Sequence, residues 1–200
     1  MKYKTSIEAW HSRGYLPHLD QSNLIQCITF RLNDAVPERV IGNWKKELGC
    51  SKKMSASHPR QIELRKRIDK YEDAGYGACW LLNNNIAAMV QETLLYFDAE
   101  RYRIIAWCIM PNHVHIIAEI LDGYSLSEII HSWKSYSSHE ANKILRRSGT
   151  FWFREYFDRY IRDEIHLVTT IDYIENNPVK AGLVAAREKW PWSSAWKYGY

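Results

Sequence analysis

Long hydrophobic runs are absent from this sequence, and none approaches the roughly 18 apolar residues that a membrane-spanning helix needs. Residues 1–6 also lack the apolar core of a signal peptide. The four cysteines are scattered and form no C-x-x-C pair, which argues against a disulfide framework or a zinc ribbon. These absences predict a soluble, cytoplasmic protein with reduced thiols and no membrane partner.

A strong excess of one charge is also missing. The chain of 200 residues has 27 Lys and Arg against 23 Asp and Glu, and this net charge of +4 excludes an overtly basic nucleic-acid binder. The basic residues nevertheless gather between Glu38 and Lys70, where ten Lys and Arg stand against four Asp and Glu. That segment is either a solvated helix face or a surface that contacts phosphates. The hydrophobic content of 46% favours one folded domain over 1–200.

The most informative stretch present is 110–120. A turn at Pro111-Asn112 leads into an extended run rich in β-branched residues, which predicts a strand. Alternate side chains of a strand point to opposite faces, so His113 and His115 share one face while the other face is wholly apolar. Two imidazoles on one face can converge on a metal ion. A lone histidine in a strand is more often a surface or hydrogen-bonded residue, so the rest of the chain has to decide.

The remaining elements predict an α+β fold. We expect a strand over 24–32, a basic helical segment over about 37–70 that is interrupted at 49–59, a helix over 84–97 and a strand over 102–109. Ser125 and Glu128 form a capping box that opens a helix ending near Gly149. An extended segment over 151–162, a helix over 163–177 and a tryptophan-rich tail follow. This order predicts a ferredoxin-like antiparallel sheet with helices packed on one face. The histidine face then lies on the open side or under the last helix.

The last predicted helix carries a tyrosine away from its apolar stripe. Projected at 100° per residue, Leu167, Val168, Ile171 and Ile174 form the expected buried side, with Tyr173 opposite them. A surface tyrosine is the simpler interpretation. If that face covers the histidines, however, the phenol and an amide oxygen one turn further on reach the ion that they hold. Mg²⁺ and Mn²⁺ both suit such ligands, and a tyrosine beside a metal-bound phosphodiester can attack it to form a covalent ester.

Taken together, the motifs resemble one known family, the REP-associated tyrosine transposases, which are relatives of the single-tyrosine HUH transposases. The resemblance covers nearly the whole chain, and its specificity comes from the motifs occurring together in this order. The matching segments are 13–18 (RGYLPH), 28–32 (ITFRL), 110–115 (MPNHVH), 132–136 (SWKSY), 151–152 (FW), 160–164 (YIRDE), 173–183 (YIENNPVKAGL) and 190–195 (WPWSSA). The chain departs from the family pattern in the basic stretch around 50–58.

The resemblance implies a metal-dependent nuclease and strand transferase acting on single-stranded DNA in transposition and recombination. It would cleave at palindromic REP hairpins by forming a 5′-phosphotyrosine and freeing a 3′-hydroxyl. His113 and His115 match the metal-binding pair, Tyr173 matches the nucleophile, and Asn177 matches the position of a third metal ligand. Asn176, His166 or water could replace Asn177. The resemblance also implies a bacterial protein that associates with the nucleoid when bound to DNA, as a monomer or a homodimer.

Several side chains are candidates for holding such a DNA. Phosphate contacts are expected from Lys134, Arg154, Arg159 and Arg162, although ordinary surface ion pairs would use the same residues. Tyr15 and His18 could stack on unpaired bases. For the tryptophans of the tail we favour core packing, because such large rings are normally buried.

Two rival functions remain. A non-catalytic hairpin-binding protein derived from a transposase needs no metal pair or nucleophile, so the intact His113, His115 and Tyr173 argue against it. A different metalloenzyme could use the histidines for hydrolysis and keep Tyr173 as a structural residue. Under the enzyme hypothesis, His113→Ala or His115→Ala is expected to cost activity far more than stability, since their face is predicted not to be the buried one.

Overall fold

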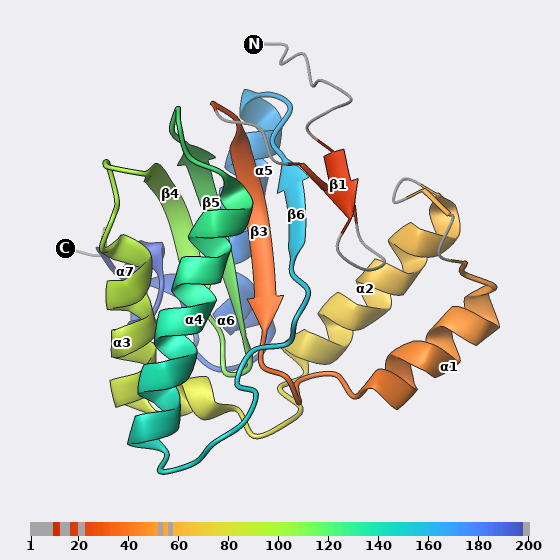
Figure 1. Ribbon diagram of the computed structural model, residues 1–200, viewed down its shortest axis with the longest axis horizontal. Coiled ribbons are helices and arrows are strands. Elements are labelled where there is room, and N and C mark those ends of the chain that lie inside the picture. The colour runs from red at the N-terminus through yellow and green to blue at the C-terminus, as the bar shows by residue number, and fades with distance from the viewer. Residues whose placement is uncertain (1–9, 13–16, 20–22, 52–53, 56–57, 198–200) are drawn as a thin grey trace.

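The computed structural model describes residues 10–12, 17–19, 23–51, 54–55 and 58–197. Its centre is an antiparallel sheet of four strands in the order β4-β5-β3-β6 (Figure 1). The strands are β3 (Ile25–Arg31), β4 (Tyr102–Ile109), β5 (His113–Ile120) and β6 (Phe157–Tyr160). Helices connect β3 to β4 and β5 to β6, which makes the topology ferredoxin-like, as the sequence predicts.

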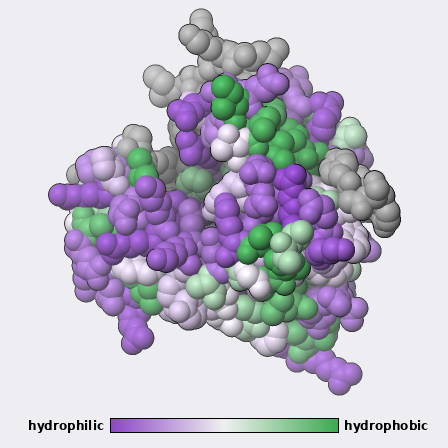
Figure 2. Space-filling model, turned by 180° about the vertical axis from the view of Figure 1, so that it is seen from behind, coloured by the Kyte–Doolittle hydropathy of each residue, from purple (hydrophilic) through white to green (hydrophobic). Residues whose placement is uncertain are grey.

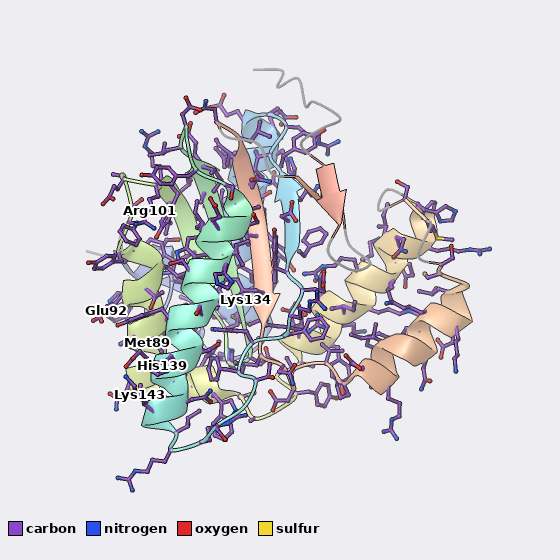
Figure 3. All side chains as sticks on the ribbon, viewed as in Figure 1. Met89, Glu92, Arg101, Lys134, His139 and Lys143 are labelled. Atoms are coloured by element: carbon purple, nitrogen blue, oxygen red, sulfur yellow. The ribbon has the colours of Figure 1, made fainter. Side chains whose placement is uncertain are left out.

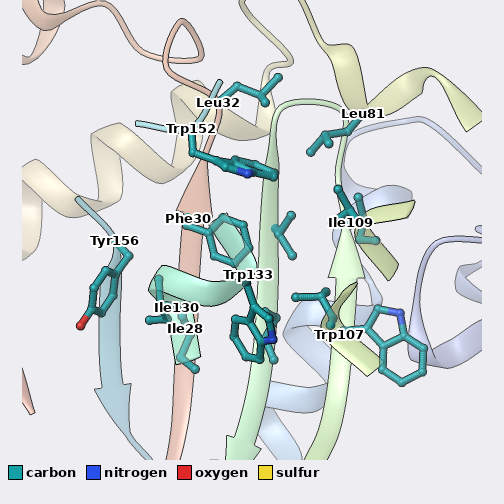
Figure 4. Close-up of a cluster of buried hydrophobic side chains, with 14 of the residues drawn as sticks. Ile28, Phe30, Leu32, Leu81, Trp107, Ile109, Ile130, Trp133, Trp152 and Tyr156 are labelled. Atoms are coloured by element: carbon teal, nitrogen blue, oxygen red, sulfur yellow. The ribbon is translucent and has the colours of Figure 1, made fainter. Parts of the chain in front are cut away.

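Two helices cover one face of the sheet. They are α3 (Asn84–Leu95) and α4 (Leu126–Ile144), which run side by side in front of the strands in Figure 1. The apolar face of β5 is fully buried in the core beneath them. Figure 4 shows the centre of this core, where the rings of Phe30 and Trp152 lie 4.8 Å apart. The Ser125 hydroxyl accepts a hydrogen bond from the Glu128 amide, so the predicted cap opens α4.

The opposite face of the sheet, on the side of the molecule seen in Figure 2, is covered as well. Helix α5 (Glu164–Glu175) and the short α6 (Asn177–Lys180) lie behind the strands in Figure 1. Here Ile174 of α5 packs with Ile117 of β5 and with Trp190 in a second, smaller core. Of the two placements predicted for the histidine face, the one under the last helix is therefore confirmed. The expectation that this face is not buried was wrong.

A helical arm projects from the β6 edge of the sheet. It consists of α1 (Glu38–Leu48) and α2 (Pro59–Asp73), the interrupted basic segment predicted from the sequence. Gly49 ends α1 in the left-handed conformation, and Pro59 opens α2. The C-terminal end of α2 returns to the sheet, where Glu72 pairs with Arg31 at 3.1 Å. The arm thus brings acidic side chains to the start of β5.

The segments at both ends of the chain pack around this frame. Two short paired strands, β1 (Trp10–Ser12) and β2 (Pro17–Leu19), lie in a region expected to be irregular. Towards the other end, the Trp190 indole donates a hydrogen bond to the Ile109 carbonyl and is buried as expected. The expectation of core packing was wrong for Trp196, which is 44% exposed. Short helical turns η2 (Trp80–Leu82), η3 (Arg187–Lys189) and α7 (Ser194–Lys197) complete the elements. Among the residues that the structure describes, no helix is both long and apolar enough to cross a membrane.

Candidate active site

The two histidines converge at the start of β5. Their Nε2 atoms lie 2.9 Å apart, with the rings nearly perpendicular to each other. Two neighbouring ligands at about 2.1 Å from an octahedral ion are separated by about 3 Å, so the pair is already at a chelating distance. The turn at 111–112 and the pleat of the strand set this geometry, as predicted from the sequence.

Neighbouring side chains orient both rings. The side-chain carbonyl of Asn112 lies 2.7 Å from Nδ1 of His113, while the Asn112 amide group donates to the Tyr76 carbonyl at 2.8 Å. Because that oxygen can only accept, His113 must carry its proton on Nδ1 and present a bare Nε2. The Thr29 hydroxyl lies 2.8 Å from Nδ1 of His115 and can accept its proton in the same way. Such outer partners are typical of metal-binding histidines.

Burial keeps both imidazoles neutral. His113 is fully buried and His115 is 4% exposed. Burial, followed by the nearby charges of Arg65 and Arg31, lowers the pKa of His113 to about 3. Burial and the adjacent His113 hold the pKa of His115 well below its ordinary value. Neutral imidazole is the form that binds metal, so both rings are ready to act as ligands at neutral pH.

A carboxylate that the sequence analysis missed completes the cluster. Asp73, the last residue of α2, places Oδ1 at 3.6 Å from Nε2 of His113, and one ligand atom from each of Asp73, His113 and His115 lies within 4.8 Å of the other two. Burial and the neighbouring Glu72 raise the pKa of Asp73 to about 6. The change from basic to acidic residues at the end of α2 was the available signal, but sequence alone does not place that helix end beside β5.

The candidate nucleophile lies beside this cluster. The Tyr173 ring on α5 is centred 6.1 Å from the His115 ring and remains 38% exposed. Burial and the carboxylates of Asp73 and Asp69 raise its pKa. The buried stripe of α5 differs from the one predicted, since Val168 is 60% exposed. Ile174 is fully buried, and Tyr173, adjacent in sequence, lies about 100° around the helix at the edge of the covered side.

The candidates for a third metal ligand differ in their burial and in their hydrogen bonds. Asn177 is 1% exposed, and neither side-chain atom has a hydrogen-bond partner among the described residues. The Asn176 amide is used, because it donates to the carbonyl and carboxylate of Asp172. His166 lies about 10 Å along α5 from Tyr173 and accepts a hydrogen bond from the Arg162 amide. An orphaned buried amide beside the nucleophile's helix fits an oxygen ligand for a divalent ion, as do the imidazole pair and Asp73.

The candidate DNA-contacting residues differ in their exposure. Lys134 lies midway along α4 (Figure 3), where its ammonium donates to the carbonyls of Phe153 and Arg154 at 2.6 and 2.8 Å. Burial lowers its pKa to about 8, so Lys134 is built into the fold. The side chains of Arg154, Arg159 and Arg162 are exposed, and Arg154 lies 4.0 Å from the Glu155 carboxylate, the kind of surface ion pair that was the alternative to a phosphate contact. Tyr15 lies outside the described residues, and only the backbone of His18 is described.

Comparison with known proteins gives a consistent result. Residues 81–177 match the family described as Transposase IS200 like. The chain is 30% identical over 105 residues to a Haemophilus influenzae protein assigned as a REP-associated tyrosine transposase, covering 46% of this chain and 58% of that protein. It is 24% identical over 107 residues to the REP-associated tyrosine transposase of Escherichia coli, covering 53% of this chain and 62% of that protein. The chain thus spans about three fifths of the length of these relatives.

The fold comparison extends over more of the chain. A solved structure of a REP-associated tyrosine transposase bound to a REP hairpin matches 92% of this chain and 81% of that one, with a TM-score of 0.53 and 17% identity. The sheet, its helices and the histidine pair therefore define a protein with the fold of the tyrosine transposases. The resemblance to the REP-associated tyrosine transposases is confirmed, since the family match over 81–177, the two relatives and the fold all agree with it.

Proposed function

We propose that the protein is a metal-dependent endonuclease and strand transferase that cleaves single-stranded DNA at REP-type palindromic hairpins. The observation that carries this proposal is the position of Tyr173, a half-exposed phenol 6.1 Å from the ring of a histidine whose Nε2 already faces a second imidazole. A structural tyrosine has no need of such neighbours.

The residues that would hold the ion are His113, His115 and Asp73, with Asn177 as a further oxygen ligand. Two imidazoles with carboxylate and amide oxygens suit Mn²⁺ or Mg²⁺. When bound, such an ion supplies a Lewis acid that orients a phosphodiester. Asn112 and Thr29 keep the two rings aimed at it.

The chemistry itself belongs to Tyr173. Its hydroxyl oxygen attacks the scissile phosphorus, the bond from phosphorus to the 3′ oxygen breaks, and the DNA becomes attached as a 5′-phosphotyrosine. The phenolic proton passes to water, and the leaving 3′ oxygen takes a proton from water. Because its pKa is raised, the phenol stays protonated at neutral pH until substrate and cation arrive.

The proposed partner is a DNA hairpin with single-stranded flanks. The solved relative is bound to a REP hairpin, and two curated relatives carry the same family name. Arg154, Arg159 and Arg162 are the exposed cations of this chain proposed to contact phosphates, and Tyr15 and His18 remain proposed base contacts. We expect the protein to act in the bacterial cytoplasm, associated with the nucleoid through its DNA.

A denaturing gel tests the proposal. The protein is incubated with Mn²⁺ and fluorescently labelled single-stranded DNA carrying a palindrome found next to its gene. Wild type should yield a protein–DNA adduct that Tyr173→Phe abolishes, whereas Tyr96→Phe, a change at an exposed tyrosine on the far side of the sheet, should leave it intact. Cleavage that survives Tyr173→Phe would support the hydrolytic alternative, and binding without cleavage would support the non-catalytic one.

A further inference from the structure

Lys180, the last residue of α6, lies beside the ring of Tyr173. Its ammonium lies 4.2 Å from the centre of the Tyr173 ring, within range of a cation–π contact. It is also close enough to Asp73 to lower the pKa of that carboxyl. One flexible cation therefore borders both the candidate nucleophile and the carboxylate nearest the histidine pair.

The local sequence explains how Lys180 reaches this position. It follows Tyr173 by seven residues, which in a continuous helix would place it about 10 Å further along the axis. Only Asn176 separates α5 from α6, which begins at Asn177 with Pro178 in its first turn. Side chains of a helix lean towards its N-terminus, so the long side chain of Lys180 reaches back and brings its ammonium over the ring.

Lys180 has no structural duty that accounts for this placement. Its side chain is exposed and forms no ion pair with any residue that the structure describes. Lys143, by contrast, is an exposed lysine that forms an ion pair with Glu140 at 2.9 Å. The carboxylates of Asp69 and Asp73 and the thiol of Cys27 face Tyr173, with Arg65 as the counter-charge from α2 and His115 beside the ring. Lys180 is the one cation that reaches this ring from α6.

We propose that Lys180 is a catalytic residue whose ammonium binds a non-bridging oxygen of the scissile phosphate and stabilises the charge that develops there as Tyr173 attacks. This inference rests on the proposed function. Phosphoryl transfer depends mainly on positioning and on cations at the equatorial oxygens, and lysine serves as a mobile point charge in such sites. A phosphate that approaches the Tyr173 hydroxyl at this site must pass within reach of Nζ.

The test measures single-turnover cleavage and DNA affinity separately. The full chain is mixed with Mn²⁺ and a labelled single-stranded hairpin with flanks on both sides, and affinity is taken from anisotropy in the Tyr173→Phe background. Lys180→Gln and Lys180→Met should slow cleavage about 100-fold, a typical loss for one stabilising donor, while affinity changes less than about threefold. Met keeps the aliphatic stem on the ring, so it separates charge from packing. Lys180→Arg should recover most of the rate, and Lys143→Gln should match wild type.

Three results would overturn the inference. The first is cleavage at the wild-type rate in Lys180→Gln, and the second is a Lys180→Arg variant as slow as Lys180→Gln. The third is a slow variant whose affinity falls as much as its rate, since that describes a binding contact without a catalytic one. Absence of any Tyr173-dependent adduct in wild type would instead reject the proposed function.

Discussion

The side-chain carbonyl of Asn112 lies 2.7 Å from Nδ1 of His113, and this contact decides which nitrogen of the ring faces the candidate metal site. The orientation of the amide is not arbitrary, because its nitrogen donates to the Tyr76 carbonyl. The loop between α2 and α3 thereby keeps Nε2 of His113 without a proton, which is the tautomer that could bind a metal there.

Asn112→Ala should therefore weaken metal binding by about 10–100-fold, the usual cost of losing an outer partner of a histidine ligand. Calorimetric titration with Mn²⁺ measures the change. Asn142→Ala, which removes a side-chain hydrogen bond to the Gly149 carbonyl far from the site, is the matched control. Unchanged affinity in Asn112→Ala would mean that the ring needs no such support.

Asp73→Asn is expected to lower Mn²⁺ affinity at least about tenfold, because an amide replaces the charged oxygen nearest His113. The same titration checks it, with Asp172→Asn as a control at an exposed carboxylate paired to Arg187.

Asn177→Leu should show whether Asn177 is an oxygen ligand in addition to Asp73. It removes an unsatisfied buried amide, so metal-free stability should hold or rise while metal affinity falls. Full affinity in Asp73→Asn together with a loss in Asn177→Leu would assign the oxygen site to Asn177 alone.

The buried histidines predict acid sensitivity of the metal-free protein. The folded pKa of His113, about 3, lies below the unfolded value of about 6.5, so acidification protonates the unfolded chain first and stability falls as pH drops below 6.5. By pH 5 one such group costs about 2 kcal/mol, at about 1.4 kcal/mol per unit. Urea unfolding in EDTA should show the stability of wild type relative to His113→Asn falling by that amount between pH 7.5 and 5. A constant difference would show that His113 titrates normally in the folded state.

The same pH range contains an opposing trend. Burial, with the charges of Glu72 and Asp73 adding to it, raises the pKa of Asp69 to about 6, so its folded state takes up a proton that the unfolded state does not. Acidification between pH 6 and 4 is therefore stabilising at Asp69. For this reason the His113 prediction is stated as a difference between two variants, in which the carboxylates cancel.

The salt dependence of DNA affinity should distinguish the exposed arginines, which are proposed to contact phosphates, from Lys134. Each lost phosphate contact reduces the slope of log affinity against log salt by about 0.7 for single-stranded DNA. We expect that reduction for Arg159→Gln and for Arg162→Gln in anisotropy titrations. Lys134→Gln should leave the slope unchanged and lower the midpoint of urea unfolding, because it loses two charge-assisted bonds to backbone carbonyls. A reduced slope for Lys134→Gln would restore it as a phosphate contact.

Local patterns predicted much of the fold because they depend only on neighbouring residues. The alternation of side chains along β5 predicted that Val114 and Ile116 face the core beneath α3 and α4. Pro111-Asn112 predicted the hairpin turn that precedes the two histidines. The helical projection of α5 failed at Val168 because packing against β4 and β5 covers only part of the apolar stripe. The face assigned to the histidines was expected to be unburied, yet α5 and the end of α2 cover it.

By itself the sequence determined the strand that aims two imidazoles in one direction, the approximate extent of the helix that carries Tyr173, and the family motifs. These depend on the pleat of a strand and the 3.6-residue turn of a helix, which are local properties. Only the tertiary structure decided that Asp73 lies close to His113, that Lys134 donates hydrogen bonds to backbone carbonyls, and that Lys180 lies over the Tyr173 ring. Residue pairs of this kind form where separate helices dock on the sheet or where the chain turns between helices, and no periodicity of one segment encodes that contact.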